Sequence, residues 1–223
     1  MGNHLCSSSS NIADDEESFR KSVERVAGTA LTRLDDLSNV GSTTFFRGQS
    51  KHIWKCRFEK DLCEYRRYVR NLNEILKLPD SDYVLKPKHV RRVGNHVVLT
   101  CMDYGKEDLY MSCQRPFDVW KMMDTLAHLA HGIHWLHSQG LAHRDVKPEN
   151  VVLHNGKYKW IDFEFTSVLE EWMICGSANY LAPYKVMQQW STNMKMRSRQ
   201  MDVFAFGKVI FFVLWAAASH YSI

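Results

Sequence analysis

Four polar side chains in the second half of the 223-residue chain have the types and spacing needed for one reaction. The segment HRDVKPENVVL (143–153) places Asp145, Lys147 and Asn150 at positions i, i+2 and i+5. An acid there can accept or orient a hydroxyl proton, and a lysine can offset the negative charge that develops on a phosphate. An asparagine oxygen and a carboxylate, here that of Asp162, can hold a magnesium ion. The set is that of phosphoryl transfer.

A predicted hairpin brings Asp162 to the other three residues. The pair Asn155-Gly156 stands between the apolar runs VVL and KYKWI, which is a strong signal for a two-residue hairpin turn. The second strand, in KWIDFEF (159–165), then ends at Asp162, at the same end as the loop. Two simpler interpretations are a solvated strand edge for Asp162 and Glu164, and a surface loop of mixed charge. Neither explains why four such groups converge.

HRDVKPEN resembles the H-R-D-x-K-x-x-N catalytic loop of the eukaryotic protein kinase superfamily. The resemblance implies that Asp145 is the catalytic base and that Lys147 contacts the transferring phosphate, as is typical of Ser/Thr kinases. It also implies that Asn150 and Asp162 bind Mg²⁺. Asp162-Phe163-Glu164 stands where the family has D-F-G, with Phe163 expected near His143.

Two later segments are similar to kinase motifs as well. CGSANYLAPY (175–184) looks like the end of an activation segment, and its Ser177 matches the small hydroxyl residue of Ser/Thr kinases. DVFAFG (202–207) resembles D-x-W-S-x-G, so Asp202 is expected to brace the backbone of the catalytic loop. Arg144 beside Asp145 resembles kinases that are controlled by phosphorylation of the activation segment. The hydroxyl residues available for this are Thr166, Ser167 and Ser177, with Ser177 expected to be structural.

The first half is similar to a nucleotide-binding lobe. HIWK (52–55) resembles the V-A-I-K strand, which would make Lys55 the lysine on the α- and β-phosphates of ATP, with Glu64 as its partner. CMDYGKEDL (101–109) looks like the hinge between lobes, with Met102 as gatekeeper. The other residues expected at the nucleotide are Gly41, Ile53, Asp103, Gly105 and Val152.

The sequence departs from the family pattern in four places. VGSTTFF (40–46) offers Gly41 but no regular G-x-G-x-x-G, so its backbone amides would cradle phosphate poorly. Lys55 and Glu64 are only nine positions apart. Glu164 replaces the D-F-G glycine, and Tyr184 replaces the glutamate of A-P-E.

These motifs predict an α+β, two-lobed, protein-kinase-like fold. We expect a disordered N-terminal tail over 1–15, a helix over 16–36 and a kinase-like domain over 37–218. Its N-lobe (37–104) would be a small antiparallel sheet with one helix. The C-lobe (105–218) would be mainly helical and end after an apolar central helix at 203–218, which Lys208 interrupts and which we interpret as a buried core helix rather than a membrane span.

The helix predicted after residue 117 carries two overlapping patterns. Apolar residues at helical spacing predict one buried stripe. The members of this stripe are Trp120, Met123, Leu126, Ala127, Ala130, Ile133 and Leu136. His128, His131, His134 and His137 lie three positions apart and could suggest a metal site, but the apolar stripe accounts for the segment more simply.

Composition sets the expected surroundings. The net charge of +4 is mild and its basic clusters read as solvated faces, so no nucleic-acid partner is expected. Six cysteines without a CxxC pair favour reduced thiols and a cytoplasmic location. MGNHLC nearly fits the N-myristoylation pattern, so acylation at Gly2 and Cys6 would give peripheral membrane association, whereas a Ser-rich tail is the alternative.

The leading hypothesis is a compact Ser/Thr protein kinase that uses ATP and Mg²⁺ and acts on protein hydroxyls. The alternative is a pseudokinase that binds nucleotide or proteins without transferring phosphate. A small-molecule kinase of the aminoglycoside type fits less well. Such enzymes lack a lysine at the position of Lys147 and a segment like the one that ends in Ala-Pro here. The short chain also resembles kinases of large DNA viruses, which would place it in a host cell, and a protein partner is expected on the exposed side of 203–218.

Overall fold

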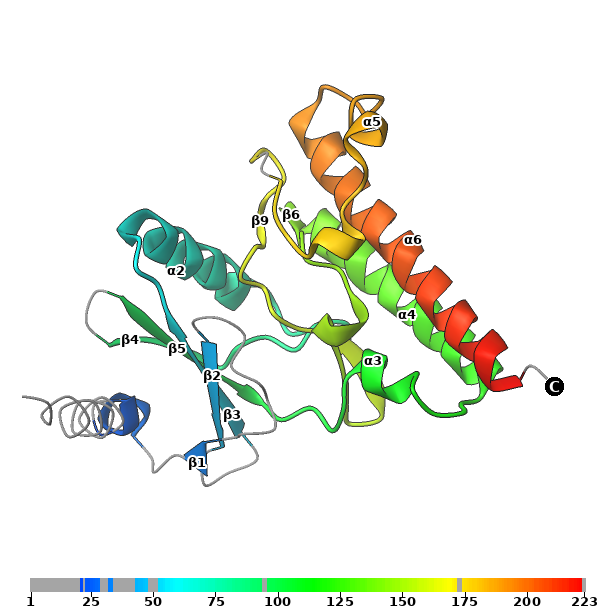
Figure 1. Cartoon of the computed structure of the whole chain (residues 1–223). Helices are drawn as coiled ribbons and strands as arrows, with labels where there is room; N and C mark the ends of the chain where they lie inside the picture. Colours follow the sequence, from blue (N-terminus) through cyan, green and yellow to red (C-terminus); the bar gives the residue numbers. More distant parts are fainter. Residues whose placement is uncertain are drawn as a thin grey trace, which may run out of the picture. The chain divides into compact units, whose positions relative to one another are not determined.

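The computed structural model describes residues 21, 23–28, 32–33, 43–47, 52–93, 96–171 and 174–221. The chain forms two compact units, Met1–Arg66 with Lys88–Asp103, and Arg67–Pro87 with Tyr104–Ile223. The sequence predicts a boundary between the two lobes after residue 104, and in the structure the first unit ends at Asp103. The structure also assigns residues 67–87 to the second unit. The α+β architecture with an antiparallel sheet and a mainly helical unit is confirmed (Figure 1).

The first unit is built on a five-stranded antiparallel sheet in the order β1-β2-β3-β5-β4. Its strands are β1 (Thr32–Arg33), β2 (Thr43–Arg47), β3 (His52–Phe58), β4 (His89–Val93) and β5 (Val97–Asp103). Trp54 and Cys56 on β3 pack with Leu99 and Cys101 on β5 to form its core. Lys55 lies opposite Thr100 and points away from this cluster, because alternate strand residues face opposite sides.

The helix predicted over 16–36 is too long at its C-terminal end. Residues 23–27 are helical, and the Gly28 N–H donates to Glu24 O (2.8 Å) at a left-handed φ of 72°, which ends the helix. Thr32 and Arg33 then pair with Arg47 and Phe46 as strand β1.

Helix α2 (Leu62–Lys77) begins in the first unit and continues into the second. The Asp61 carboxylate caps it by accepting the N–H groups of Cys63 (2.6 Å) and Glu64 (3.1 Å). Its start is therefore set locally, whereas its buried face depends on packing.

Two long helices dominate the second unit. Helices α4 (Val119–Ser138) and α6 (Met194–Tyr221) lie side by side (Figure 1). The shorter elements are α3 (Leu109–Ser112), β6 (Leu141–Ala142), η1 (Pro148–Asn150), β7 (Val151–His154), β8 (Lys157–Trp160), β9 (Ser167–Val168), η2 (Ala178–Tyr180) and α5 (Tyr184–Met187). Trp160, fully buried at the end of β8, packs in the common core.

The predicted stripe of α4 is partly wrong. Leu126, Ile133 and Leu136 are buried as expected, but Trp120 is 83% exposed and Met123 is also exposed. The alanines 127 and 130 face solvent too. The buried face instead follows Met122, Leu126, Leu129, Gly132, Ile133, Leu136 and His137. Spacings of three and four fit either stripe, so the choice between them depends on which residues the other elements can contact.

The predicted hairpin is confirmed. Strands β7 and β8 pair with Val151 opposite Trp160 and His154 opposite Lys157. Asn155 (φ 51°) and Gly156 (φ 79°) form the connection, and positive φ at both central residues is the conformation that matches the twist of a tight hairpin.

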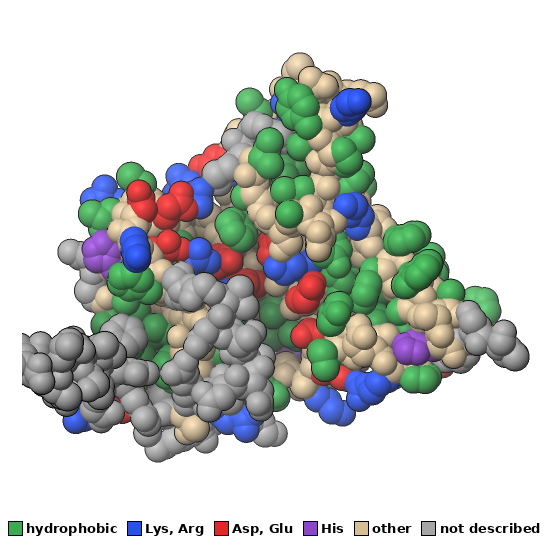
Figure 2. All heavy atoms as spheres, in the orientation of Figure 1, with side chains coloured by type: hydrophobic (Ala, Val, Ile, Leu, Met, Phe, Trp, Pro, Cys, Tyr) green, Lys and Arg blue, Asp and Glu red, His purple; other side chains and the backbone are tan. Residues whose placement is uncertain are grey.

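Helix α6 is longer than the predicted 203–218 and has two different sides. Ala205, Phe206, Val209, Val213 and Ala216 are buried in the core of the second unit. Hydrophobic atoms also gather along the exposed side (Figure 2). The exposed large hydrophobic residues of α6 are Met194, Met196, Val203, Phe211, Leu214 and Trp215. By length and composition alone α6 could cross a membrane, and 44% of its most apolar window is buried inside the protein.

Gly132 allows α4 to approach Trp160. A Cβ at position 132 would lie 2.8 Å from Trp160 Cδ1 and 3.0 Å from its Nε1, which donates to Leu129 O (3.0 Å). Trp160 is held on all sides, so it can yield little. Gly207 in α6 has no atom within 4 Å of the corresponding point.

We therefore expect Gly132→Ala to lower the free energy of unfolding by about 1–3 kcal/mol, although alanine favours helix. The matched change Gly207→Ala should raise it by up to about 1 kcal/mol, because only helix propensity changes. Urea unfolding followed by tryptophan fluorescence would measure both. Equal stabilisation by the two changes would contradict the close packing on Trp160.

Candidate active site

The Asp145 carboxylate lies at the centre of a hydrogen-bond network on the catalytic loop. Its Oδ2 accepts the Asn150 side-chain N–H (2.8 Å) and pairs with Lys147 Nζ (2.9 Å). Its Oδ1 accepts both the backbone N–H (2.8 Å) and the hydroxyl (2.9 Å) of Ser177. Lys147 Nζ also donates to Ser177 Oγ (2.7 Å), which closes the network. The structure thus brings together Asp145, Lys147 and Asn150 as predicted, and adds Ser177 to them.

This network keeps Asp145 ionised although the residue is only 4% exposed. Burial is the largest influence and raises the pKa of the carboxyl group. The hydrogen bond and charge of Lys147, the Ser177 hydroxyl and the charge of His143 together outweigh it, so the pKa lies below its ordinary value. A buried anion with two fixed oxygens can accept a hydrogen bond from an incoming hydroxyl.

Asp202 at 1% exposure holds the backbone before Asp145. Its Oδ1 accepts the Arg144 N–H (2.8 Å), and its Oδ2 accepts the His143 N–H (2.8 Å) and contacts His137 Nε2 (2.8 Å). Arg144 has a left-handed φ of 67°, which such fixed bonds stabilise. The predicted bracing role of Asp202 is confirmed.

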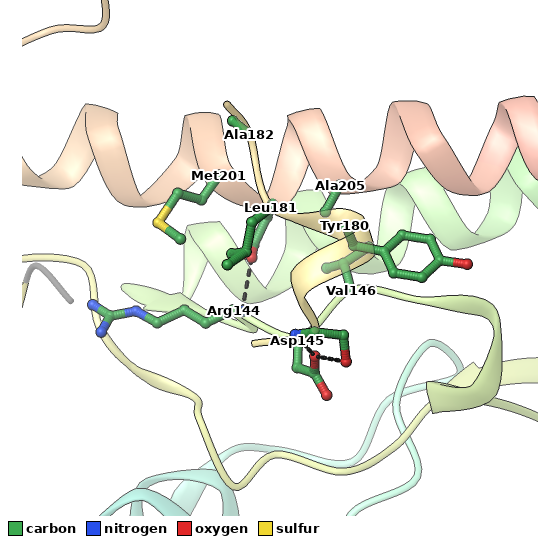
Figure 3. A pocket seen from close by; sticks show the side chains of 10 residues that line it. Arg144, Asp145, Val146, Tyr180, Leu181, Ala182, Met201 and Ala205 are labelled. Atoms are coloured by element: carbon green, nitrogen blue, oxygen red, sulfur yellow. Dashed lines mark hydrogen bonds between the residues drawn. The ribbon is translucent and has the colours of Figure 1, made fainter. Parts of the chain in front are cut away.

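A close backbone approach places Ser177 on Asp145. Gly176 has φ 104°, and a Cβ there would lie 2.3 Å from Arg144 O. Only glycine fits such a position. Behind this contact lies a small pocket lined by residues of the catalytic loop, of 177–182 and of α6 (Figure 3). The sequence motif pointed to Ser177, but the role of Gly176 follows only from the structure.

The hairpin brings the segment before Asp162 to Asn150. The Ile161 N–H donates to Asn150 O (2.9 Å), and Ile161 O contacts His143 Nε2 (3.0 Å). Asp162 follows with a left-handed φ of 61°. Phe163 is buried with its ring 5.2 Å from that of His143, as the sequence predicted.

Asn150 and Asp162 fit a magnesium ion by their chemistry. Both bonds of the Asn150 side-chain N–H₂ group go to Asp145, so its carbonyl oxygen remains the atom to offer a metal. The Asp162 carboxylate offers the second hard oxygen ligand. Among the described residues no group of three or more His, Cys, Asp or Glu side chains could hold a metal. A site with few protein ligands suits Mg²⁺, which keeps waters and binds substrate phosphates.

The buried polar residue of α2 is Asn71, which the sequence analysis missed. Asn71 is 2% exposed, and its side chain donates to Glu164 O (2.9 Å), next to Phe163. Glu64, the predicted functional acid of this helix, instead lies in its first turn and is partly exposed. Asn71 occupies the inward face that Tyr68 and Ile75 define at helical spacing, so a polar residue on that face was the available signal.

The other residues predicted to contact the nucleotide belong to different units of the chain. In the first, Lys55 and Ile53 are buried on β3, and the Asp103 carboxylate pairs with Lys88 Nζ (2.6 Å) and contacts His52 (3.2 Å). In the second, Gly105 lies so close to Val152 that a Cβ on it would be 2.6 Å from Val152 Cβ. Gly41 lies outside the described residues, and the pairing of Lys55 with Glu64 stays a prediction.

Comparison with known proteins decides the family. Residues 50–221 match the family model described as protein kinase domain. The chain belongs to the protein kinase family. Its fold and the loop around Asp145, braced by Asp202, agree with this assignment. A protein kinase domain implies the use of ATP.

Individual kinases are similar to the chain at low to moderate identity. It is 26% identical over 208 residues to the cAMP-dependent protein kinase catalytic subunit PRKX of Mus musculus, covering 84% of this chain and 56% of that protein. It is 38% identical over 204 residues to the putative serine/threonine-protein kinase PRKY of Homo sapiens, covering 82% and 70%. A third relative is the dual specificity protein kinase TTK of Mus musculus, at 24% identity over 214 residues, covering 85% of this chain and 24% of TTK. The chain thus spans little more than half the length of PRKX.

The ion pair of Asp145 with Lys147 should make the stability of the protein depend on pH. The pKa of Asp145 in the folded protein lies below the unfolded value of about 3.9, so its stabilising contribution is present above that pH and is lost as pH falls through the folded pKa. Lys147→Met leaves Asp145 buried but removes the opposing charge, so the pKa of Asp145 should rise. We expect urea unfolding, followed by circular dichroism, to show a variant less stable than the wild type at pH 7. The difference in unfolding free energy should narrow as pH falls through the pKa of Asp145, because the protonated carboxyl group no longer needs the lysine.

Lys157→Met is the matched control. It removes the Nζ that pairs with Asp82 Oδ2 (2.6 Å), but Asp82 is exposed and remains solvated. The difference in unfolding free energy between this variant and the wild type should therefore be smaller and change less with pH than for Lys147→Met. An equal pH dependence in both variants would show that burial of Asp145 has no part in the effect.

Proposed function

We propose that this chain is an active Ser/Thr protein kinase that transfers the γ-phosphate of ATP to protein hydroxyl groups with Mg²⁺. The observation that carries the proposal is the closed network of Asp145, Lys147, Asn150 and Ser177. Phosphoryl transfer depends mainly on positioning and electrostatic stabilisation, and these residues are held in place before any substrate binds.

Each member of the network has a separate role in this proposal. Asp145 accepts a hydrogen bond from the substrate hydroxyl, aligns its oxygen and takes its proton as the phosphate bond forms. Lys147 lies 2.9 Å from Asp145 Oδ2 and offsets negative charge on the transferring group. Asn150 fixes Asp145 through its N–H groups and, with Asp162, would hold Mg²⁺, which neutralises charge on the ATP phosphates when bound. Lys55, with Glu64 as its predicted partner, would bind the α- and β-phosphates.

The residues proposed for the nucleotide base follow from the resemblance to kinases. Ile53 and Val152 are proposed to enclose the adenine, with Asp103 and Gly105 along its edge. The buried apolar side chain of Ile53 and the close contact of Gly105 with Val152 support this assignment. Gly41 would supply its backbone N–H group to the phosphates.

A pseudokinase is the second candidate, and specific observations favour it. The segment over 40–46 has no regular glycine pattern, and Glu164 stands at the D-F-G glycine position. The buried polar residue of α2 that faces Glu164 is the neutral Asn71 rather than an acid. Such a protein would bind ATP without transferring phosphate.

The deciding experiment measures transfer from labelled Mg-ATP to generic Ser/Thr and Tyr peptides. Asp145→Asn keeps the shape of the side chain but removes the base, so transfer should fall at least about 100-fold. Thermal unfolding with and without Mg-ATP would show that the variant folds and still binds nucleotide. A nucleotide-stabilised wild type that transfers nothing would establish the pseudokinase, and transfer mainly to tyrosine would overturn the Ser/Thr assignment.

Ser177 provides a second test of the same network. Ser177→Ala removes a hydroxyl bonded to both Asp145 and Lys147, so kcat should fall on the order of tenfold. Ser177→Thr keeps the hydroxyl and should retain most of the activity. If alanine and threonine reduced kcat equally, the hydroxyl would have no role in catalysis.

Partners and location follow the same proposal. The substrates are proteins that present serine or threonine, with no nucleic acid expected, and the location is the cytoplasm of the cell or of a viral host. The exposed apolar residues of α6, including Phe211 and Trp215, support a protein partner on that side. Membrane anchoring through Gly2 and Cys6 stays a prediction, since both residues lie outside the described part of the chain.

A further inference from the structure

Two consecutive residues of α2 contact the two ends of one segment, Glu164–Glu171. The Asn71 side chain donates to Glu164 O (2.9 Å) at the start of the segment. Arg70 Nη2 contacts both carboxylate oxygens of Glu171 at its end, at 3.0 and 3.1 Å. Helix α2 therefore contacts both ends of the segment that follows Asp162 in the chain.

The opposite side of the segment is attached to the catalytic loop and to α6. Arg144 Nη2 donates to Val168 O (3.3 Å) and to Glu171 O. Figure 3 shows the Arg144 side chain extending away from Asp145. The Leu169 N–H donates to Gly140 O (2.9 Å), and Ser198 Oγ of α6 contacts Leu169 O (2.9 Å). Arg144 thus connects this segment directly to Asp145, its neighbour in the chain.

The sequence of this region leaves no accessible hydroxyl for phosphorylation. VLEEWMICG (168–176) contains no serine, threonine or tyrosine. Thr166 is fully buried, with its hydroxyl on His143 O (3.3 Å), and Ser167 is only 3% exposed. Ser177 is already bonded to Asp145 and Lys147. The negative group that Arg70 contacts is supplied by the side chain of Glu171.

We propose that α2 holds the segment Glu164–Glu171 in its working conformation through Arg70–Glu171 and Asn71–Glu164, without phosphorylation. Glu171 and Arg70 are positioning residues: they order the segment to which Arg144 binds, and so the loop that carries Asp145. The effect on catalysis rests on the proposed kinase function, whereas the ordering of the segment does not.

The expected size of the effect follows from exposure. The side chains of Arg70 and Glu171 are 55% and 35% exposed, so solvent and salt screen their attraction. Removing such a pair typically changes an equilibrium by up to about fivefold. Charge reversal at either position should not unfold the protein, because neither side chain is in the core.

The test uses Arg70→Glu, Glu171→Arg and the double variant with the charges exchanged. Hydrogen exchange of the amides from Thr166 to Glu171 reports order, and kcat/KM reports activity after phosphatase treatment. Each single change should speed exchange and lower kcat/KM by about fivefold, and the exchanged pair should restore both to within about twofold. The defects should be smaller in high salt, where the pair is already screened.

A neighbouring acid supplies the matched control. Glu170 pairs with Lys195 (2.6 Å) rather than with α2. Combining Arg70→Glu with Glu170→Arg introduces the same two charges one position away, so exchange should stay fast and activity low.

Three results would overturn the proposal. They are unchanged hydrogen exchange in both single variants, rescue by the Glu170 control equal to that of the exchanged pair, and loss of all transfer on phosphatase treatment with recovery after phosphorylation. If the wild type transferred no phosphate but the variants showed the predicted changes in hydrogen exchange, the ordering of the segment by α2 would be supported and the kinase proposal refuted. The two proposals therefore fail separately.

Discussion

Asp202 is the buried charge on which the geometry of the active site depends. Its two oxygens accept the N–H groups of His143 and Arg144 and contact His137, so a carboxylate from α6 fixes the loop that carries Asp145. A buried carboxylate is costly unless all its bonds are made, and here three donors satisfy it. The left-handed backbone of Arg144 is tolerated for the same reason. Helix α6 therefore positions the loop that carries Asp145 through its place in the core.

A second buried carboxylate, Asp145, has a different kind of environment. Asp202 is satisfied mainly by backbone donors, whereas Asp145 is surrounded by the side chains of Lys147, Asn150 and Ser177. Backbone donors fix the shape of the loop, and the side chains tune charge. The lowered pKa of Asp145, in spite of burial, shows that these side chains outweigh the cost of desolvation. One fold thus separates the rigid support of a site from its reactive group.

Helix α2 links these elements to the segment that follows Asp162, the proposed metal ligand. Its buried asparagine binds the backbone after Phe163, and the adjacent arginine binds an acid seven residues further along. The first contact is buried and directional, whereas the second is exposed and depends on salt. In the proposed arrangement, the end of the segment next to Asp162 is fixed, and the order of the rest responds to small changes in charge.

The sequence by itself determined the chemical set, because the spacing of Asp145, Lys147 and Asn150 and the Asn155-Gly156 turn are local features that fix their own geometry. It also predicted a small antiparallel sheet with one helix and the bracing role of Asp202, but not strand β1, which lies where a helix was expected. Only the tertiary structure decided which stripe of α4 is buried, because residues at three- and four-residue spacing fit two faces and Trp160 selects one of them. It likewise ended the first helix at Gly28 and showed that Asn71 is a buried polar residue of α2, bonded to Glu164 O. Those outcomes depend on contacts between segments far apart in the chain, and local spacing does not specify such contacts.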